Sequence, residues 1–109
     1  MALAHGGVTS ERWFKLSLAE QMGNIGSEVS RATRWYNKDE ALFAGATRRC
    51  LELFDLTLAD PRWVARRQEI NRAREVFVDA TYGGEQYQST LPDLLKYFDQ
   101  FALAARKGY

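Results

Sequence analysis

The spacing of apolar and polar residues along the chain predicts helices. From residue 18 to residue 36, apolar side chains recur at intervals of four, three, four, three and four positions. This spacing places them on one face of a helix that packs against other helices. The face consists of Leu18, Met22, Ile25, Val29, Ala32 and Tyr36. The sequence therefore predicts a long helix that forms part of a bundle.

A second stripe on the same helix consists of the small residues Ala19, Gly23, Gly26 and Ser30. Glycine inside a helix lowers stability by about 0.5–1 kcal/mol relative to alanine, because glycine loses more backbone conformational freedom when the chain folds. Two glycines three positions apart indicate that a neighbouring helix comes close enough to offset this cost. We therefore predict close helix packing along this stripe.

Capping residues and chain breakers divide the chain into four predicted helices. Ser10 and Asp39 are of the types preferred at helix N-caps, and Asp60 precedes Pro61, a favoured first helical residue. The predicted helices span residues 10–37, 40–59, 61–82 and 91–106. Short connections make consecutive helices antiparallel neighbours. The predicted fold is all-α, a single-domain, antiparallel up-down-up-down four-helix bundle after a disordered leader, residues 1–9.

The predicted helix 40–59 carries two adjacent apolar stripes, so its apolar surface covers a wide arc. A helix of this kind needs two neighbours, or one neighbour and a second subunit. This surface is one reason to expect a homo-oligomer or an accessory subunit of a larger complex.

Composition limits the class of protein. The chain has 109 residues, of which 46% are hydrophobic and 27% are charged, as in a single globular domain. Its apolar runs are too short to cross a bilayer. The first ten residues lack the basic start and apolar middle of a secretory signal, which favours a cytoplasmic protein with no membrane contact.

The residue types that carry catalysis are scarce. Cys50 and His5 are the only cysteine and histidine, and the chain has no nucleotide-binding, zinc-protease or hydrolase motif. Cys50 lies on an apolar helix face, which predicts a buried structural thiol. We therefore expect a protein that is not an enzyme and that has no catalytic residue, cofactor, metal or small-molecule ligand.

Polar residues in the middle of the first predicted helix define a candidate network with acids of the second. Its members are Asn24, Glu28, Arg31, Glu52 and Asp55. If they face inward, such a network would fix the register of the helices. An ordinary solvated face is the alternative. A carboxylate-bridged metal enzyme is a third hypothesis for these acids, although the Glu-x-x-His pairs of such bundles are absent.

Arginine is concentrated in the middle of the chain. Residues 31–74 hold nine arginines and one lysine against six acids. Guanidinium groups bind phosphate and carboxylate, and aromatic side chains add stacking surface. Salt-bridged helix faces are the simpler interpretation. The candidate surface for RNA or a protein partner consists of Arg31, Arg34, Trp35, Trp63, Arg66 and Arg67.

The segment 18–32, LAEQMGNIGSEVSRA, resembles the opening helix of a family of small uncharacterised bacterial and archaeal helical proteins. Segments 51–57, 74–76 and 97–106 are similar to later parts of that family. The resemblance implies a four-helix bundle and brings no assigned activity. In shape the predicted bundle also resembles the proteins encoded in ribosomal-RNA intervening sequences and the accessory protein of diversity-generating retroelements. Those proteins form oligomeric barrels and are associated with RNA or reverse transcriptase.

These features favour a non-catalytic helical binding or scaffold protein, with itself or another protein as partner. An RNA-binding accessory protein that uses its arginine-rich surface is the alternative.

Overall fold

The computed structural model describes residues 3–4 and 8–107. Four helices of fifteen to twenty residues dominate the described part: α2 (Leu18–Trp35), α3 (Glu40–Ala59), α4 (Arg67–Thr81) and α5 (Leu91–Arg106). A short α1 (Ser10–Trp13) precedes α2, and a 3-10 helix η2 (Pro61–Arg66) precedes α4. The fold is therefore all-α, apart from the two-residue strands β1 (Leu3–Ala4) and β2 (Val8–Thr9).

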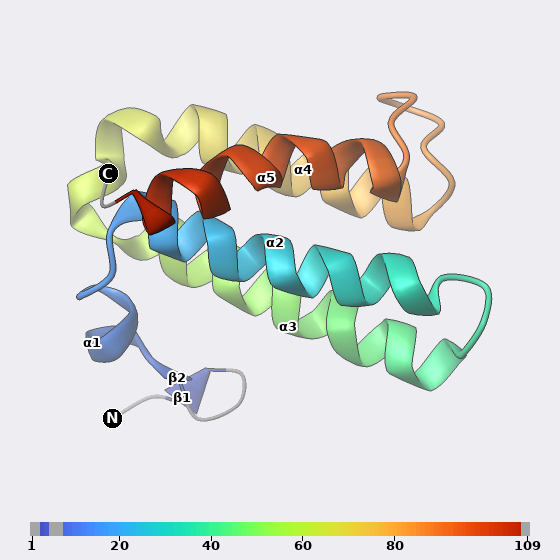
Figure 1. Ribbon diagram of the computed structural model, residues 1–109, viewed down its shortest axis with the longest axis horizontal. Coiled ribbons are helices and arrows are strands. Elements are labelled where there is room, and N and C mark those ends of the chain that lie inside the picture. The colour runs from blue at the N-terminus through green and yellow to red at the C-terminus, as the bar shows by residue number, and fades with distance from the viewer. Residues whose placement is uncertain (1–2, 5–7, 108–109) are drawn as a thin grey trace.

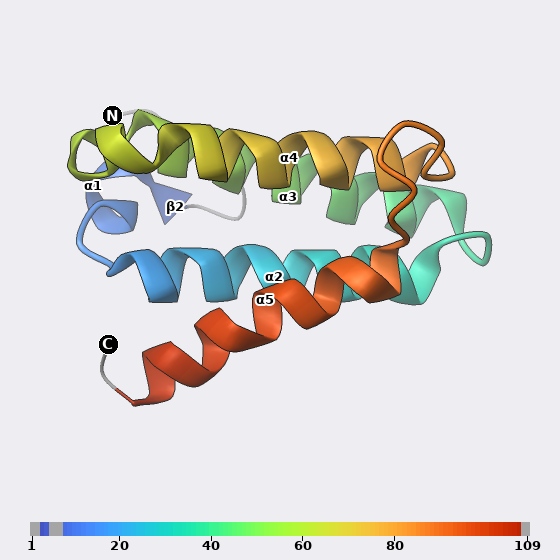
Figure 2. The same cartoon turned by 90° about the horizontal axis from the view of Figure 1, so that it is seen from above.

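Each long helix runs opposite to the one before it (Figure 1). Helix α2 lies at the centre, since it packs along its length against both α3 and α5. Helix α4 packs against α3 and approaches α5 over only part of its length. Figure 2 shows α5 turning away from α4 and α2 toward its C-terminal end. One side of α5 is therefore closed, and the other is partly open.

The first helix is shorter than the predicted range 10–37. The helix stops at Trp13, and a new one begins at Leu18. Ser17 caps it by accepting a hydrogen bond from Glu20 N at 3.1 Å, while the Glu20 carboxylate accepts one from Ser17 N at 3.0 Å. This reciprocal capping box starts a helix at Leu18 and so ends continuity with the preceding turn. The expected cap Ser10 is the first residue of α1, and Thr9 caps it instead.

The predicted helix 61–82 is also divided. Asp60 caps η2, whose backbone is distorted at Trp63 (φ −104°, ψ 20°), and the regular helix begins only at Arg67. Helices α3 and α5 coincide with the ranges expected from the sequence.

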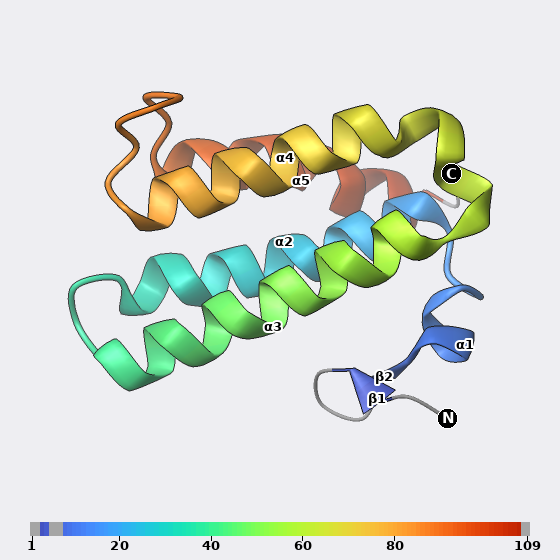
Figure 3. The same cartoon turned by 180° about the vertical axis from the view of Figure 1, so that it is seen from behind.

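The leader contains β structure where the sequence analysis expects disorder. Leu3 pairs with Thr9 and Ala4 with Val8 in an antiparallel ladder. The rest of the expected leader, residues 1–2 and 5–7, lies outside the described residues. Figure 3 shows this strand pair and α1 beside the C-terminal end of α3.

The core lies where α2, α3, α4 and α5 meet. Phe54 is fully buried and contacts Phe77 of α4 and Phe98 of α5, with ring centroids 6.3 and 6.1 Å apart. Met22, Ile25 and Val29 of α2 close the core from the other side. Among the helices described, none is both long enough and apolar enough to cross a bilayer.

Candidate binding groove between helices α4 and α5

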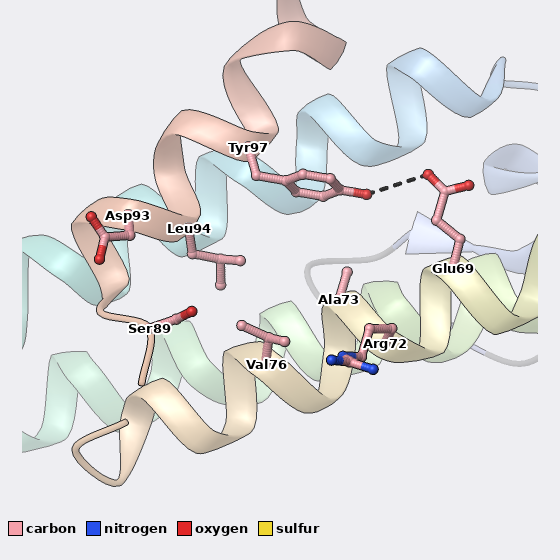
Figure 4. A pocket seen from close by; sticks show the side chains of 8 residues that line it. All are labelled: Glu69, Arg72, Ala73, Val76, Ser89, Asp93, Leu94 and Tyr97. Carbon is pink, nitrogen blue, oxygen red and sulfur yellow. Dashed lines mark hydrogen bonds between the residues drawn. The ribbon is translucent and has the colours of Figure 1, made fainter. Parts of the chain in front are cut away.

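An open groove of about 350 Å³ lies between α4 and α5, and its lining is mostly apolar. Ala73 and Leu94 are buried at its base, while Val76 and Tyr97 are half-buried. Figure 4 shows the two helices facing each other across it, with polar groups at its edges. The lining residues are Glu69, Arg72, Ala73, Val76, Ser89, Asp93, Leu94 and Tyr97.

The polar edge of the groove is held by local contacts. Arg66 binds the Glu69 carboxylate, with Arg66 Nη2 at 3.0 Å from Glu69 Oε2. The hydroxyl of Tyr97 donates to Glu69 Oε1 across the groove at 3.5 Å (Figure 4). Burial raises the pKa of Tyr97, and the charge of Glu69 raises it further. Tyr97 therefore remains a neutral hydrogen-bond donor at physiological pH.

The remaining charges at the edge also have defined positions. The Arg72 guanidinium lies over the ring of Tyr87, 4.7 Å from its centroid. Asp93 and Thr90 form the capping box that starts α5. The edge therefore carries charges of both signs: Glu69 is paired with Arg66, Asp93 belongs to the α5 cap, and Arg72 lies over an aromatic ring.

The small-residue stripe of α2 lies at the closed side of α5. A Cβ atom on Gly26 would lie 2.8 Å from Phe98 Cβ, closer than two such carbons approach. Beside this contact, Gly23, Gly26 and Ser30 line an open depression of about 280 Å³ together with Phe98 of α5. Ala19 is half-buried, whereas Ser30 is exposed. The close approach predicted for this stripe is therefore observed at Gly26.

The candidate network on α2 and α3 divides into separate parts. Glu28 is 3% exposed and is bound by Arg31 and by Arg49, whose Nε lies 3.1 Å from Glu28 Oε2. Arg49 was not among the predicted members of the network. The two residues are 21 positions apart, so only the packing of α2 on α3 reveals the pair.

Asn24 and Asp55 make contacts other than with Glu28. Asn24 is exposed and donates to Glu20 O of its own helix at 2.8 Å. Asp55 is exposed and pairs with Arg74 of α4, with Arg74 Nε at 3.0 Å from Asp55 Oδ1. Glu52 is half-buried. Asn24 and Asp55 therefore lie on solvated helix faces, which is the alternative that the sequence left open for them.

A second buried network was not predicted. Gln21 is fully buried, and its amide donates to Trp13 O at 2.8 Å and to Asp60 Oδ2 at 3.1 Å. Its Oε1 accepts from Trp63 Nε1 at 2.8 Å. Arg62 binds the Asp60 carboxylate through Nε and Nη2. The Asp60-Pro61 pair marks the helix start, but the burial of Asp60 against α2 follows only from the tertiary fold.

The candidate RNA or partner surface is not continuous. Arg31, Arg34 and Trp35 lie near the C-terminal end of α2, beside the connection to α3. Trp63, Arg66 and Arg67 lie in η2 and at the start of α4, at the opposite end of the molecule (Figure 3). These six residues therefore form two separate groups, since antiparallel helices place the two segments at opposite ends of the molecule.

Cys50 is fully buried, and its thiol lies 4.0 Å from Ile25 O. Burial raises the pKa of Cys50, and the nearby charge of Glu28 raises it further. A thiol in this setting stays protonated, as a structural role requires. Within residues 3–4 and 8–107, no three His, Cys, Asp or Glu side chains gather as metal ligands would.

No family model, curated protein or solved structure matches this chain. The family resemblance of segment 18–32 and the later segments stays a prediction.

Proposed function

We propose that this chain is a non-catalytic binding protein, built as an up-down-up-down four-helix bundle, that holds another polypeptide in the groove between α4 and α5. Helix α1 and η2 are additions to that bundle. The observation that carries the proposal is the mostly apolar, open groove of about 350 Å³ between two helices of the core.

The form of the groove favours a polypeptide over a small polar ligand. Its base is apolar at Ala73 and Leu94, and its charged groups, Glu69, Arg72 and Asp93, lie at the edge. Protein interfaces commonly combine an apolar centre with a polar rim. A helix that lays an apolar face into such a groove is a recurring mode of recognition. The setting we propose is the cytoplasm.

Site-specific photo-crosslinking tests this proposal. A photoreactive phenylalanine analogue at Val76 places the reactive group in the groove, and the same analogue at Ala44 places it on the exposed side of α3. In cells that produce the chain, we expect an adduct with a polypeptide at position 76 only. Equal adducts at both positions, or none at position 76, would contradict a role for the groove.

RNA binding is a second candidate, favoured by the other end of the molecule. A depression beside the α2–α3 connection contains Tyr36, Lys38, Phe43 and Tyr82, and the side chain of Tyr82 is mostly exposed, at 82%. Aromatic and cationic groups together bind single-stranded nucleic acid. Binding of a labelled oligonucleotide that weakens steeply with salt and requires Tyr82 would support this candidate. Unchanged binding by Tyr82→Ala would contradict it.

A further inference from the structure

The connection between α4 and α5, residues 82–90, is fastened to the outside of α4. The Asp79 carboxylate accepts hydrogen bonds from two backbone N–H groups of the connection, Gln86 N at 3.0 Å and Tyr87 N at 2.9 Å. Gly84 N donates to the backbone oxygen of Asp79 at 3.0 Å. One residue of α4 therefore holds three positions of the connection.

Tyr87 adds two side-chain contacts with α4. Its hydroxyl donates to Glu75 Oε2 at 3.0 Å, and the Arg72 guanidinium lies over its ring, 4.7 Å from the centroid. Arg72, Glu75 and Asp79 follow one another at intervals of three and four positions, so they share one face of α4. The backbone, the ring and the hydroxyl of Tyr87 are thus all bound to the same face of α4.

The same connection reaches the groove. Arg72 and Ser89 both line the groove, and Figure 4 shows Ser89 at its end, where the chain enters α5. The next residue, Thr90, caps α5. A Cβ atom on Gly84 would lie 2.4 Å from Ser89 O, so the two arms of the connection touch each other. Residues 82–90 therefore form a compact strap between the face of α4 that holds Tyr87 and the first turn of α5.

Direct packing between α4 and α5 is limited beside the groove. Helix α5 is held mainly by α2, and α4 is held mainly by α3. The hydrogen bond that crosses the groove, from Tyr97 to Glu69, is long at 3.5 Å and therefore weak. The strap thus adds a direct link between α4 and the start of α5 at the point where the two helices leave a space between them.

We propose that the strap presets the separation of α4 and α5 and so keeps the groove open for a polypeptide, with Tyr87 as the positioning residue. This inference rests on the proposed function and adds a means of regulating that site. A groove that is open before its ligand arrives binds without first having to order its two walls. Release of Tyr87 frees Arg72 and Ser89, and so lowers the affinity of the groove. By linkage, a ligand in the groove stabilises the fastened strap.

Spin labels at Gln68→Cys on α4 and Lys96→Cys on α5 measure the separation of the two helices in the full chain. Both positions are exposed, and the native Cys50 does not compete for the label because it is fully buried. Double electron–electron resonance reports the distribution of distances between the labels. We expect one narrow distribution with the strap intact and a distribution at least about twofold broader in Tyr87→Ala, because local opening frees the start of α5. An unchanged distribution in Tyr87→Ala would overturn the proposal.

Tyr82→Ala is the matched control. Tyr82 is a second tyrosine of the strap, but its side chain is 82% exposed, so we expect its removal to leave the distance distribution unchanged. Equal broadening in Tyr82→Ala and Tyr87→Ala would overturn the role of Tyr87. Far-UV circular dichroism checks that the variants keep their helices. If Tyr87→Ala loses them, Tyr87→Phe decides the question, because it removes only the hydrogen bond to Glu75. A distribution in Tyr87→Phe as narrow as in the unaltered strap would then overturn the proposal.

Photo-crosslinking at Val76 separates this inference from the proposed function. We expect less adduct in the Tyr87→Ala background than in the Tyr82→Ala background, because only the former loosens a wall of the groove. Equal yields in the two backgrounds would overturn the regulatory role of the strap. If the unaltered chain gives no adduct at position 76, the proposed function fails, whereas broadened distances in Tyr87→Ala still support the strap as the spacer of α4 and α5.

Discussion

Helix α5 has two neighbours, and the two contacts differ. Toward α2, the packing is so close that Gly26 leaves no room for a Cβ atom beside Phe98. Toward α4, Ala73 and Val76 face Leu94 and Tyr97 across an open groove of about 350 Å³. The same helix therefore completes the core on one side and presents an unfilled apolar surface on the other.

The difference shows how sequence controls the separation of two helices. At the α2 contact, a residue without a side chain at the crossing point lets the backbones approach. On α4, the buried residues Ile70, Ala73, Phe77 and Ala80 recur at intervals of three, four and three positions, which gives α4 one narrow apolar stripe. That stripe packs into the core, and little apolar surface remains to close the space beside Tyr97.

The largest expected effect is at the closed contact. Gly26→Leu forces a side chain against Phe98 and should lower the free energy of unfolding by about 3 kcal/mol, at the upper end for overpacking of a core. Urea denaturation measures this change in the free energy of unfolding. The matched control is Gly45→Leu, because a Cβ there meets only the end of the flexible Arg49 side chain at 3.3 Å. Because leucine has a higher helix propensity than glycine, Gly45→Leu should leave the free energy of unfolding unchanged or raise it slightly. An equal loss in both variants would contradict contact with Phe98 as the cause.

The next effect concerns the buried Asp60, which is 1% exposed and bound by Arg62 and Gln21. Asp60→Asn should lower the free energy of unfolding by about 2 kcal/mol, since it weakens a charged hydrogen-bond set and a cap. The matched control is Asp55→Asn, because Asp55 is an exposed acid whose ion pair with Arg74 contributes little. A loss at position 55 as large as at position 60 would contradict the role of burial.

The same residue predicts a pH dependence. The hydrogen bond from Arg62 lowers the pKa of Asp60 from 3.8 to about 2 in the folded chain. Because the pKa is lower in the folded chain, the unfolded chain takes up the proton first as the pH falls. The contribution of the Asp60 carboxylate to the free energy of unfolding is therefore present above pH 3.8 and is lost as the pH falls through about 2. Urea midpoints of the wild type and Asp60→Asn should converge over this range. A constant difference would exclude titration of Asp60 as the cause.

The smallest expected effect on stability comes from a comparison of a valine in the core with a valine at the groove. Val29 is 0% exposed in the core, and Val76 is half-buried at the groove. Val29→Thr should lower the free energy of unfolding by about 1.5 kcal/mol, because it buries a hydroxyl. Val76→Thr should change it by less than about 0.5 kcal/mol, because the hydroxyl reaches water in the groove. Equal losses in chemical denaturation would indicate that the groove is closed in solution.

Sequence reasoning works best for features that depend on local pattern. The apolar face of α2, the ends of α3 and α5 and the close contact at Gly26 all follow from spacing and capping residues. The break before Leu18 was missed, although Ser17 and Glu20 have the spacing of a capping box, because apolar residues continue on both sides of it.

The candidate site was less predictable. The sequence predicts that Asp60 caps a helix. It does not predict the contact of Asp60 with Gln21, because the two residues are 39 positions apart. No sequence motif marks the groove, because it is the space that remains between α4 and α5 after their side chains have packed into the core. The arginines near Trp35 and Trp63 form no single surface because the direction of the helices, and not composition, decides which ends meet.

Hydrogen–deuterium exchange of the full chain, purified alone and purified together with the polypeptide that crosslinks at Val76, tests most directly whether the open side of α5 is the binding surface. We expect amides in segments 69–76 and 93–97 to exchange more slowly in the presence of that polypeptide, while those of α2 are unchanged. Protection that rises on α2 or α3 instead, with α4 and α5 unaffected, would contradict binding at the groove.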